Sequence, residues 1–295
     1  MVPKICYPAI ASAILAAGAT AQDMPLSQVL VDGEGWELVA DGLKFGDACA
    51  ADKDGNFYFS DVAGGTAIKK VTPRGKVTDY IEGISGISGM QFGPDGTLYA
   101  CQYREGRVVA LRPGAEPVVL CAGVKPNDLV VTNDGWIYFT ETPTGRVYRV
   151  RSEKPDGATQ VAEGITKPNG IALSPDGGTL LVSDHQEDKV WFFRIRDDGE
   201  LDCREAYGHL RLRNEEAQSR GDGSDVDGVG RYYVTSDLGV QMFDPTGRRS
   251  GVILAPNTTR PLVSIAFAGE GLSYMYVANG AAVYRRKTKT KGTGR

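Results

Sequence analysis

Hydrophobic and polar positions along this chain follow a unit that recurs about every 40 residues. Each unit contains an Asp-Gly or related dipeptide, followed by a short apolar or aromatic run that ends in a polar residue. The dipeptides begin at positions 54, 95, 134, 176, 229 and 270. Short apolar runs bounded by Gly and Asp are typical of β-strands and the turns between them. The pattern therefore predicts six copies of one strand-rich unit, and no segment carries a long helical period.

Further strands on both sides of the dipeptide complete the unit. After it, one apolar run passes through a turn into another in segments 62–76, 101–114, 141–152 and 184–199. Before it, an apolar strand leads through Gly into the next unit in segments 36–48, 77–89, 117–129 and 159–171. Several short strands per repeat of this length are typical of a β-propeller. We predict an all-β fold, a six-bladed β-propeller.

The ends of the repeat array define the expected boundaries. The strand from Trp36 to Gly42 has no earlier unit to join, so we expect it to supply the outer strand of the last blade and close the ring. The propeller is predicted over 36–286, after a leader segment at 22–35 and before a basic tail at 287–295. Such a tail is expected to be solvated.

One connection is longer than the others. The interval between the fourth and fifth dipeptides holds about ten extra residues, within Asp197 to Gly221. Loops on rigid scaffolds often carry function. The sequence leaves two interpretations open, a lid or substrate wall and a plain surface excursion.

The first 21 residues have the pattern of a secretory signal peptide. Lys4 precedes the apolar run PAIASAILAAG, and Ala19-Thr20-Ala21 provides a small-residue cleavage site. The apolar run is too short to span a bilayer. We therefore expect an exported protein, periplasmic or extracellular, that is mature from about Gln22. The net charge of -4 gives no indication of a nucleic-acid partner.

Four cysteines remain once Cys6 leaves with the signal. Their spacing matches no CxxC metal pattern. They are either buried unpaired thiols or disulfide partners, and the sequence does not define the pairing. The four are Cys49, Cys101, Cys121 and Cys203.

Oxygen-bearing side chains recur at one fixed offset from the dipeptides. Equivalent positions on the innermost strands of a propeller face the same end of the central channel, so these side chains should form a ring. Counting back seven residues from the first five dipeptides, and aligning the sixth unit, gives Asp47, Ser88, Asn127, Asn169, Asp222 and Ser264.

The composition of this ring suggests a metal site. Asp and Asn are poor strand formers, and carboxylates gathered on one axis repel one another without a cation. Two carboxylates and two amides favour Ca²⁺, with Mg²⁺, Mn²⁺ or Zn²⁺ as competitors, and the lack of His argues against a His-rich zinc site. The alternative is that the Asx residues only cap the turns that lead into the strands.

Three motifs carry a family resemblance. KPNDLVVTNDGWIYFTE, KPNGIALSPDGGTLLVSD and GDGSDVDGVGRYYVTS occur in this order after an acidic residue in the first unit. Together they resemble the regucalcin/gluconolactonase family, which includes senescence marker protein and luciferin-regenerating-enzyme-like proteins. The resemblance spans Trp36 to Arg286. It implies a six-bladed propeller and, as in many members, a metal-dependent lactone hydrolase.

The resemblance also implies roles for individual residues. Asn169 and Asp222 match metal ligands, and Asp222 also matches the general base. Asn127 matches a residue near the metal and its bound water or substrate, and Lys125 lies where many relatives carry a substrate-contacting Arg. Asp47 falls where the family usually has Glu followed by Gly-Pro, so its carboxylate here has a shorter reach.

The leading hypothesis is a metal-dependent lactonase acting on a sugar lactone or another small lactone. Asp47, Asn127, Asn169 and Asp222 would surround the cation, which polarises the carbonyl and lowers the pKa of a bound water. Asp222 and Asn127 are the predicted catalytic residues, because Asp222 would take the proton of that water and Asn127 would position water or substrate.

Substrate contacts are predicted for Lys125, Ser88 and Ser264. Of the two histidines, His185 is more typical of a surface or channel rim than of a base. Two other functions remain open: a non-catalytic exported propeller that binds a sugar or protein partner, and a related hydrolase of phosphoesters or other esters.

Overall fold

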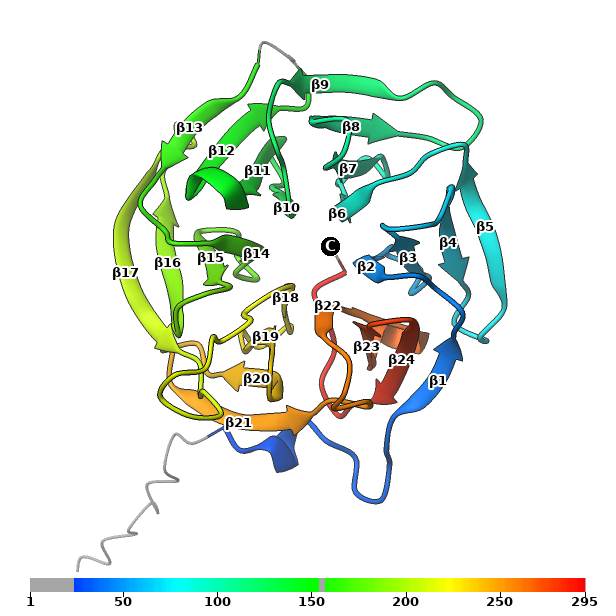
Figure 1. The fold of residues 1–295 in the computed structure, drawn as a ribbon, viewed down its shortest axis with the longest axis vertical. Helices are drawn as coiled ribbons and strands as arrows, with labels where there is room; N and C mark the ends of the chain where they lie inside the picture. The colour runs from blue at the N-terminus through cyan, green and yellow to red at the C-terminus, as the bar shows by residue number, and fades with distance from the viewer. Residues whose placement is uncertain (1–23, 154–156, 295) are drawn as a thin grey trace, which may run out of the picture.

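Six four-stranded antiparallel sheets surround a central axis, as Figure 1 shows in a computed structural model that describes residues 24–153 and 157–294. This confirms the predicted six-bladed β-propeller. The predicted signal peptide, residues 1–21, lies outside the described residues. Within the described part of the chain, no helix has the length and apolar character needed to cross a membrane.

The strands of a blade follow one another in sequence from the axis outward. Blade one holds β2 (Gly46–Ala51), β3 (Phe57–Asp61), β4 (Ala67–Val71) and β5 (Val77–Glu82). Blade two holds β6 (Ile87–Phe92), β7 (Leu98–Gln102), β8 (Arg107–Leu111) and β9 (Val118–Ala122). Blade three holds β10 (Leu129–Val131), β11 (Trp136–Glu141), β12 (Arg146–Arg151) and β13 (Thr159–Ala162).

The second half of the ring repeats this order. Blade four holds β14 (Pro168–Leu173), β15 (Thr179–Asp184), β16 (Lys189–Ile195) and β17 (Leu201–His209). Blade five holds β18 (Ser224–Val226), β19 (Tyr232–Ser236), β20 (Gly239–Phe243) and β21 (Arg249–Leu254). Blade six holds β22 (Leu262–Ala268), β23 (Tyr274–Asn279), β24 (Ala282–Lys287) and β1 (Glu37–Ala40). Three short 3₁₀ turns are η1 (Leu26–Gln28), η2 (Thr142–Thr144) and η3 (Glu270–Leu272).

The N-terminal strand closes the ring as predicted. β1 pairs antiparallel with β24, with Glu37 opposite Arg285. The guanidinium of Arg285 donates a 2.8 Å hydrogen bond to the Glu37 carboxylate. Because the last blade takes its outer strand from the start of the chain, the two ends of the repeat array are held together and the edge of β24 is covered.

Aromatic residues of the repeated second strand form much of the core. Four tyrosines are fully buried between blades: Tyr58, Tyr138, Tyr233 and Tyr276. Burial of a side chain of this size contributes about 1.5–3 kcal/mol. The hydroxyl groups are not left unsatisfied, since Tyr58 donates to Asp52 and Tyr138 donates to the Gly199 carbonyl. The aromatic runs that defined the repeat are therefore the packing surfaces between blades.

The leader packs against the propeller, so the fold begins before Trp36. Val29 is fully buried, and Leu26 and Leu30 pack on the same hydrophobic cluster of blades five and six. The backbone amide of Lys289 donates a 2.7 Å hydrogen bond to the Val29 carbonyl. These apolar side chains fill the outer surface beside β21 and β24, which explains why a segment without strands is ordered.

The C-terminal tail packs against the propeller through Thr288 and Thr290, so the expectation of a solvated tail is wrong there, whereas Lys289 and Lys291 are exposed. Thr288 and Thr290 are 4% and 8% exposed. The Thr290 hydroxyl donates to the buried Asp227 carboxylate at 2.9 Å, and the Lys291 carbonyl accepts from the Gly228 amide. The chain then runs to the centre of the ring (Figure 1), where Thr293 lines the axial cavity. The tail therefore covers one end of the channel.

The four cysteines Cys49, Cys101, Cys121 and Cys203 are all free thiols. Cys101 and Cys121 are buried on strands, whereas Cys203 is exposed. This agrees with the interpretation of unpaired thiols.

Candidate active site

The inner strand of every blade begins with a β-bulge. In blade one, Gly46 lies opposite Asp61 and Cys49 opposite Phe59, so the inner strand holds one extra residue. Blades two, four and six show the same irregularity. In blade three, the Asn127 amide and the Asp128 carbonyl both bond to the backbone of Thr140. A bulge leaves one residue unpaired and redirects its side chain.

The bulged residues are those that the repeat offset identified. They are Asp47, Ser88, Asn127, Asn169 and Asp222 in the first five blades. Blade six differs from the expected alignment, because Leu262 faces Asn279 and Ser264 faces Ala278. This register places Val263 at the equivalent position, one residue before Ser264.

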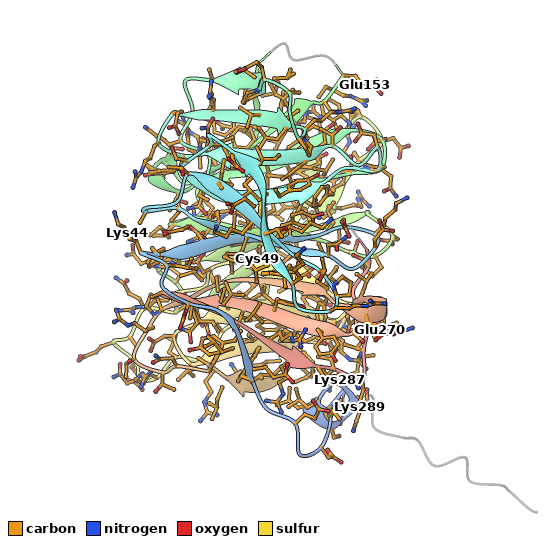
Figure 2. The ribbon with its side chains drawn as sticks, turned by 90° about the vertical axis from the view of Figure 1, so that its right-hand side faces the viewer. Lys44, Cys49, Glu153, Glu270, Lys287 and Lys289 are labelled. Atoms are coloured by element: carbon orange, nitrogen blue, oxygen red, sulfur yellow. The ribbon has the colours of Figure 1, made fainter. Side chains whose placement is uncertain are left out.

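A different set of residues holds the turns that lead into the inner strands. Each is the polar residue that ends a second strand. Asp61 accepts hydrogen bonds from the amides of Lys44 and Phe45, and Glu141 accepts one from the amide of Lys125. Because these carboxylates make the turn contacts, the Asx residues of the ring are not needed for that role. Lys44 belongs to one of these turns, and Figure 2 shows it at the face of the ring opposite to Glu270.

Two carboxylates interact across the axis. Burial raises the pKa of Asp47 well above its ordinary value, and the charges of Asp222 and Asp128 raise it further. Burial and then the charge of Asp128 likewise raise the pKa of Asp222, whose side chain is 15% exposed. Asp128 was not predicted from the sequence as a site residue. Burial raises the pKa of Asp128 to about 7, although its carboxylate accepts backbone amides of Leu129 and Ile171.

Asn169 supplies an oxygen that has no partner. Its side chain is 7% exposed, and its Oδ1 is buried without a hydrogen bond. Its Nδ2 lies 3.3 Å from Nδ1 of His185, and that ring nitrogen lies 3.7 Å from a carboxylate oxygen of Asp222. Burial lowers the pKa of His185, and the charges of Lys167 and Arg220 lower it further. A neutral imidazole nitrogen can accept a hydrogen bond from Nδ2, which leaves Oδ1 as the free acceptor.

These donors fit a hard divalent cation. Among the described residues, no three His, Cys, Asp or Glu side chains form a metal-binding cluster by themselves. The set is instead mixed, with two mutually repelling carboxylates and an orphaned amide oxygen. Ca²⁺ accepts carboxylate, carbonyl and water oxygens in flexible geometry, so the chemistry of the set matches this ion.

The other predicted site residues differ in burial and in their partners. Asn127 occupies the bulge of blade three and is partly buried. Lys125 is exposed, with its ammonium 5.7 Å from the centre of the Tyr103 ring. The Ser88 hydroxyl donates to the Asn127 carbonyl at 2.7 Å and therefore supports the neighbouring blade.

Ser264 lies deeper than the mouth of the channel. Its hydroxyl accepts the Cys49 amide at 3.1 Å, and the residue lines the small axial cavity shared with Thr293. Substrate contacts by Ser88 and Ser264 stay predictions.

A pocket of about 400 Å³ opens beside Asp222. His185 and the connection between β17 and β18, through Gln218 and Arg220, form one side, and the β21–β22 connection forms the other. The long connection is thus a pocket wall. It is fixed there because the Gln241 side chain bonds both the amide and the carbonyl of Arg211.

The sequence favoured a surface or channel-rim position for His185, whereas the structure places it beside Asn169 and Asp222. It directly follows Asp184, whose carboxylate accepts the Thr166 amide and so holds the turn that leads to Asn169. The repeat carried a signal for this position. Because Asp184 holds the turn that leads into β14, the residue that follows it lies near the bulge at Asn169.

Comparisons with known proteins agree with the fold. The chain is 25% identical to the gluconolactonase of Zymomonas mobilis over 293 residues, covering 87% of this chain and 82% of the relative. A gluconolactonase structure from Xanthomonas campestris superposes with a TM-score of 0.77 at 22% identity, covering 89% of this chain and 92% of that one. The calcium-binding protein regucalcin from Agrobacterium tumefaciens superposes with a TM-score of 0.71 at 16% identity, covering 88% and 95%.

The family comparison covers most of the propeller. Residues 45–281 match the SMP-30/Gluconolactonase/LRE-like region, which includes all five Asp, Asn and Ser bulge residues and His185. With the bulged ring, the neighbouring pocket and this match together, the chain belongs to the SMP-30/gluconolactonase/LRE-like family.

Proposed function

We propose that the protein is a lactonase that uses a divalent cation, Ca²⁺ as first choice, at the mouth of the propeller. Asp47, Asn169 and Asp222 would hold the ion, with Asn127 beside it. The observation that carries this proposal is the buried Oδ1 of Asn169, which has no partner and belongs to a side chain 3.3 Å from His185. When bound, such a cation supplies Lewis-acid polarisation of the lactone carbonyl and stabilises the developing oxyanion.

Asp222 acts as the general base. It is one residue of the pocket wall and is partly buried, which favours its neutral form and so makes its carboxylate a better proton acceptor than a solvated one. It takes a proton from water while the water oxygen bonds to the lactone carbonyl carbon. The ring C–O bond then breaks, and the leaving oxygen takes up a proton to give a hydroxy acid. Asn127 orients the water or the substrate.

His185 positions Asn169. Its neutral Nδ1 accepts from the Asn169 amide nitrogen, which fixes the amide with its oxygen available. The same Nδ1 lies 3.7 Å from a carboxylate oxygen of Asp222, which is beyond hydrogen-bond distance, so the restraint acts on Asn169.

The relatives support the substrate class. Gluconolactonase from Zymomonas mobilis acts on a sugar lactone by name, and we extend that class to this chain. We also propose that the protein is exported, on the basis of the signal-like pattern at residues 1–21.

A lactone panel tests the function. Metal-stripped protein receives Ca²⁺, Mn²⁺, Mg²⁺ or Zn²⁺, and hydrolysis of sugar and acyl lactones is followed by acid release. We expect activity with at least one ion, and Asp222→Ala should lower kcat by about 10²-fold or more. Wild-type turnover in Asp222→Ala would refute the mechanism, and no turnover with any lactone and ion would refute the function.

A further inference from the structure

Two arginines line the pocket beside Asp222. Arg220 comes from the β17–β18 connection and Arg260 from the β21–β22 connection, so the two lie on walls contributed by different blades. The carboxylates that line the pocket are Asp222 and Asp237. The volume of about 400 Å³ lies in the range of small-molecule sites, about 300–1,000 Å³.

Neither acid neutralises both arginines. Asp222 belongs to the proposed cation site. Asp237 accepts a 2.9 Å hydrogen bond from Arg213, whereas its distance to Arg220 is 3.9 Å. Within the described residues, no carboxylate lies within 4.0 Å of the Arg260 guanidinium. The pocket therefore has positive charge that its own side chains leave available.

The backbone of Arg220 is held in an unusual conformation at the pocket wall. Its φ is +51°, in the left-handed region that a bulky side chain rarely adopts. The chain is fixed there, because the Arg220 amide donates to the His185 carbonyl at 3.0 Å and the Ser219 hydroxyl donates to the Asp184 carbonyl. Glycine would suit this position better. A strained arginine at a ligand pocket points to a requirement for its side chain.

We propose that the natural substrate is a lactone that also carries an anionic substituent, a carboxylate or a phosphate, bound by Arg220 and Arg260. This inference rests on the proposed lactonase function and names its substrate class. Arginine forks pair with both groups through two parallel, charge-assisted hydrogen bonds. The anionic group occupies the arginine side of the pocket, while the lactone carbonyl lies toward Asp222.

Matched substrates and variants test the proposal. Glucaro-1,4-lactone is compared with glucono-1,4-lactone for the carboxylate, and 6-phosphoglucono-1,5-lactone with glucono-1,5-lactone for the phosphate. We expect a higher kcat/KM for an anionic member, and the pair that shows it identifies the substituent. Arg260→Gln and Arg220→Gly should each reduce this preference at least tenfold, mainly through KM.

Two controls separate binding from folding. Arg220→Gly should keep or raise the Tm, because glycine adopts the left-handed backbone without strain. Arg74→Gln, in the exposed β4–β5 turn outside the pocket, should leave the preference unchanged. Calorimetry with glucarate, the open-chain dianion, gives a readout independent of turnover, and both pocket variants should weaken this binding at least tenfold.

The outcomes are distinguishable. Equal or better hydrolysis of the neutral lactones, with no effect of either arginine variant, would overturn the anionic substrate and leave the lactonase standing. If no lactone is hydrolysed with any ion, the proposed function fails. Glucarate binding that is the same in wild type and both pocket variants would also overturn the arginine site.

Discussion

The side-chain amide nitrogen of Asn169 lies 3.3 Å from Nδ1 of His185, and the amide oxygen on the same side chain is buried without a partner. His185, which is not itself a proposed ligand, therefore orients the amide of Asn169, which is. The same ring nitrogen lies 3.7 Å from a carboxylate oxygen of Asp222, which belongs to blade five. The central claim about the site, an oxygen cage completed by a cation, depends on this arrangement.

His185→Ala should weaken Ca²⁺ binding about 10- to 100-fold, because the amide of Asn169 loses the acceptor that orients it. Isothermal calorimetry of the metal-stripped protein measures this dissociation constant. His185→Gln, which restores an acceptor oxygen, should recover part of the affinity. His209→Ala is the matched control, since His209, on the outer strand β17 of blade four, is 57% exposed and pairs with Asp188. An unaltered Ca²⁺ affinity in His185→Ala would contradict the positioning role.

Asp225 should make the stability of the metal-free protein depend on pH. Burial raises its pKa from 3.8 to about 7, although its carboxylate accepts the Phe267 and Val226 amides. The folded state then binds more protons than the unfolded state between these two values, so the free energy of unfolding falls as pH rises from about 4 to about 7. Thermal unfolding in EDTA across this range measures it.

Asp225→Asn provides the comparison for that series. The variant cannot ionise at this position, so its Tm should fall less steeply with pH than that of the wild type. Burial also raises the pKa of Asp128 to about 7, so the Tm of both proteins should retain part of its dependence on pH. Parallel Tm curves for wild type and Asp225→Asn would show that Asp225 does not titrate in this window.

Thr290→Ala should lower the free energy of unfolding by about 1–2 kcal/mol, because the buried carboxylate of Asp227 loses a hydrogen-bond donor. Arg231 and Tyr233 continue to donate to the same oxygen, which limits the loss. Urea denaturation measures the change. The matched control is Thr78→Ala on the exposed outer strand β5, which should change stability by less than about 0.5 kcal/mol. Equal effects of the two substitutions would mean that the tail is not bound as described.

The repeated part of the fold could be predicted from the sequence because every blade needs the same turns and the same buried strand. An Asp-Gly turn, a buried apolar or aromatic strand and a polar strand end recur in each of the first four units, and ring closure by β1 follows from the unpaired strand at Trp36. The same regularity located Asp47, Asn127, Asn169 and Asp222, since the bulge recurs at a fixed distance from the turn.

Features outside the repeat were harder to predict. The tail binds through the Thr290 hydroxyl and backbone groups around Asp227, and such contacts leave no hydrophobic period in the sequence. The leader is held by a few apolar residues, chiefly Val29. In blade six, aligning the apolar run placed Ser264 at the ring position, whereas counting back seven residues from Glu270 gives Val263, as the register has it. His185 does not occupy the ring position that the offset defines, so counting from the dipeptides did not identify it.

Asp47→Asn should reduce the stabilisation that Ca²⁺ gives. One of the two proposed carboxylate ligands loses its charge, so the affinity of the site falls while the mutual repulsion with Asp222 is relieved in the metal-free state. The metal-free variant should therefore melt at or above the wild-type temperature, yet gain less on addition of Ca²⁺. Differential scanning calorimetry with and without 1 mM Ca²⁺, on the order of 100 Kd for a 10 μM site, measures both effects. A gain equal to that of the wild type would exclude Asp47 as a ligand.

The most direct test is a Ca²⁺ titration of metal-stripped protein in which glucono-1,5-lactone hydrolysis and Tm are followed on the same samples. The account predicts that both rise together and saturate with one bound ion per chain, and that Asp222→Asn abolishes the rise in activity. Full lactone hydrolysis in EDTA, with a Tm that Ca²⁺ does not change, would contradict it.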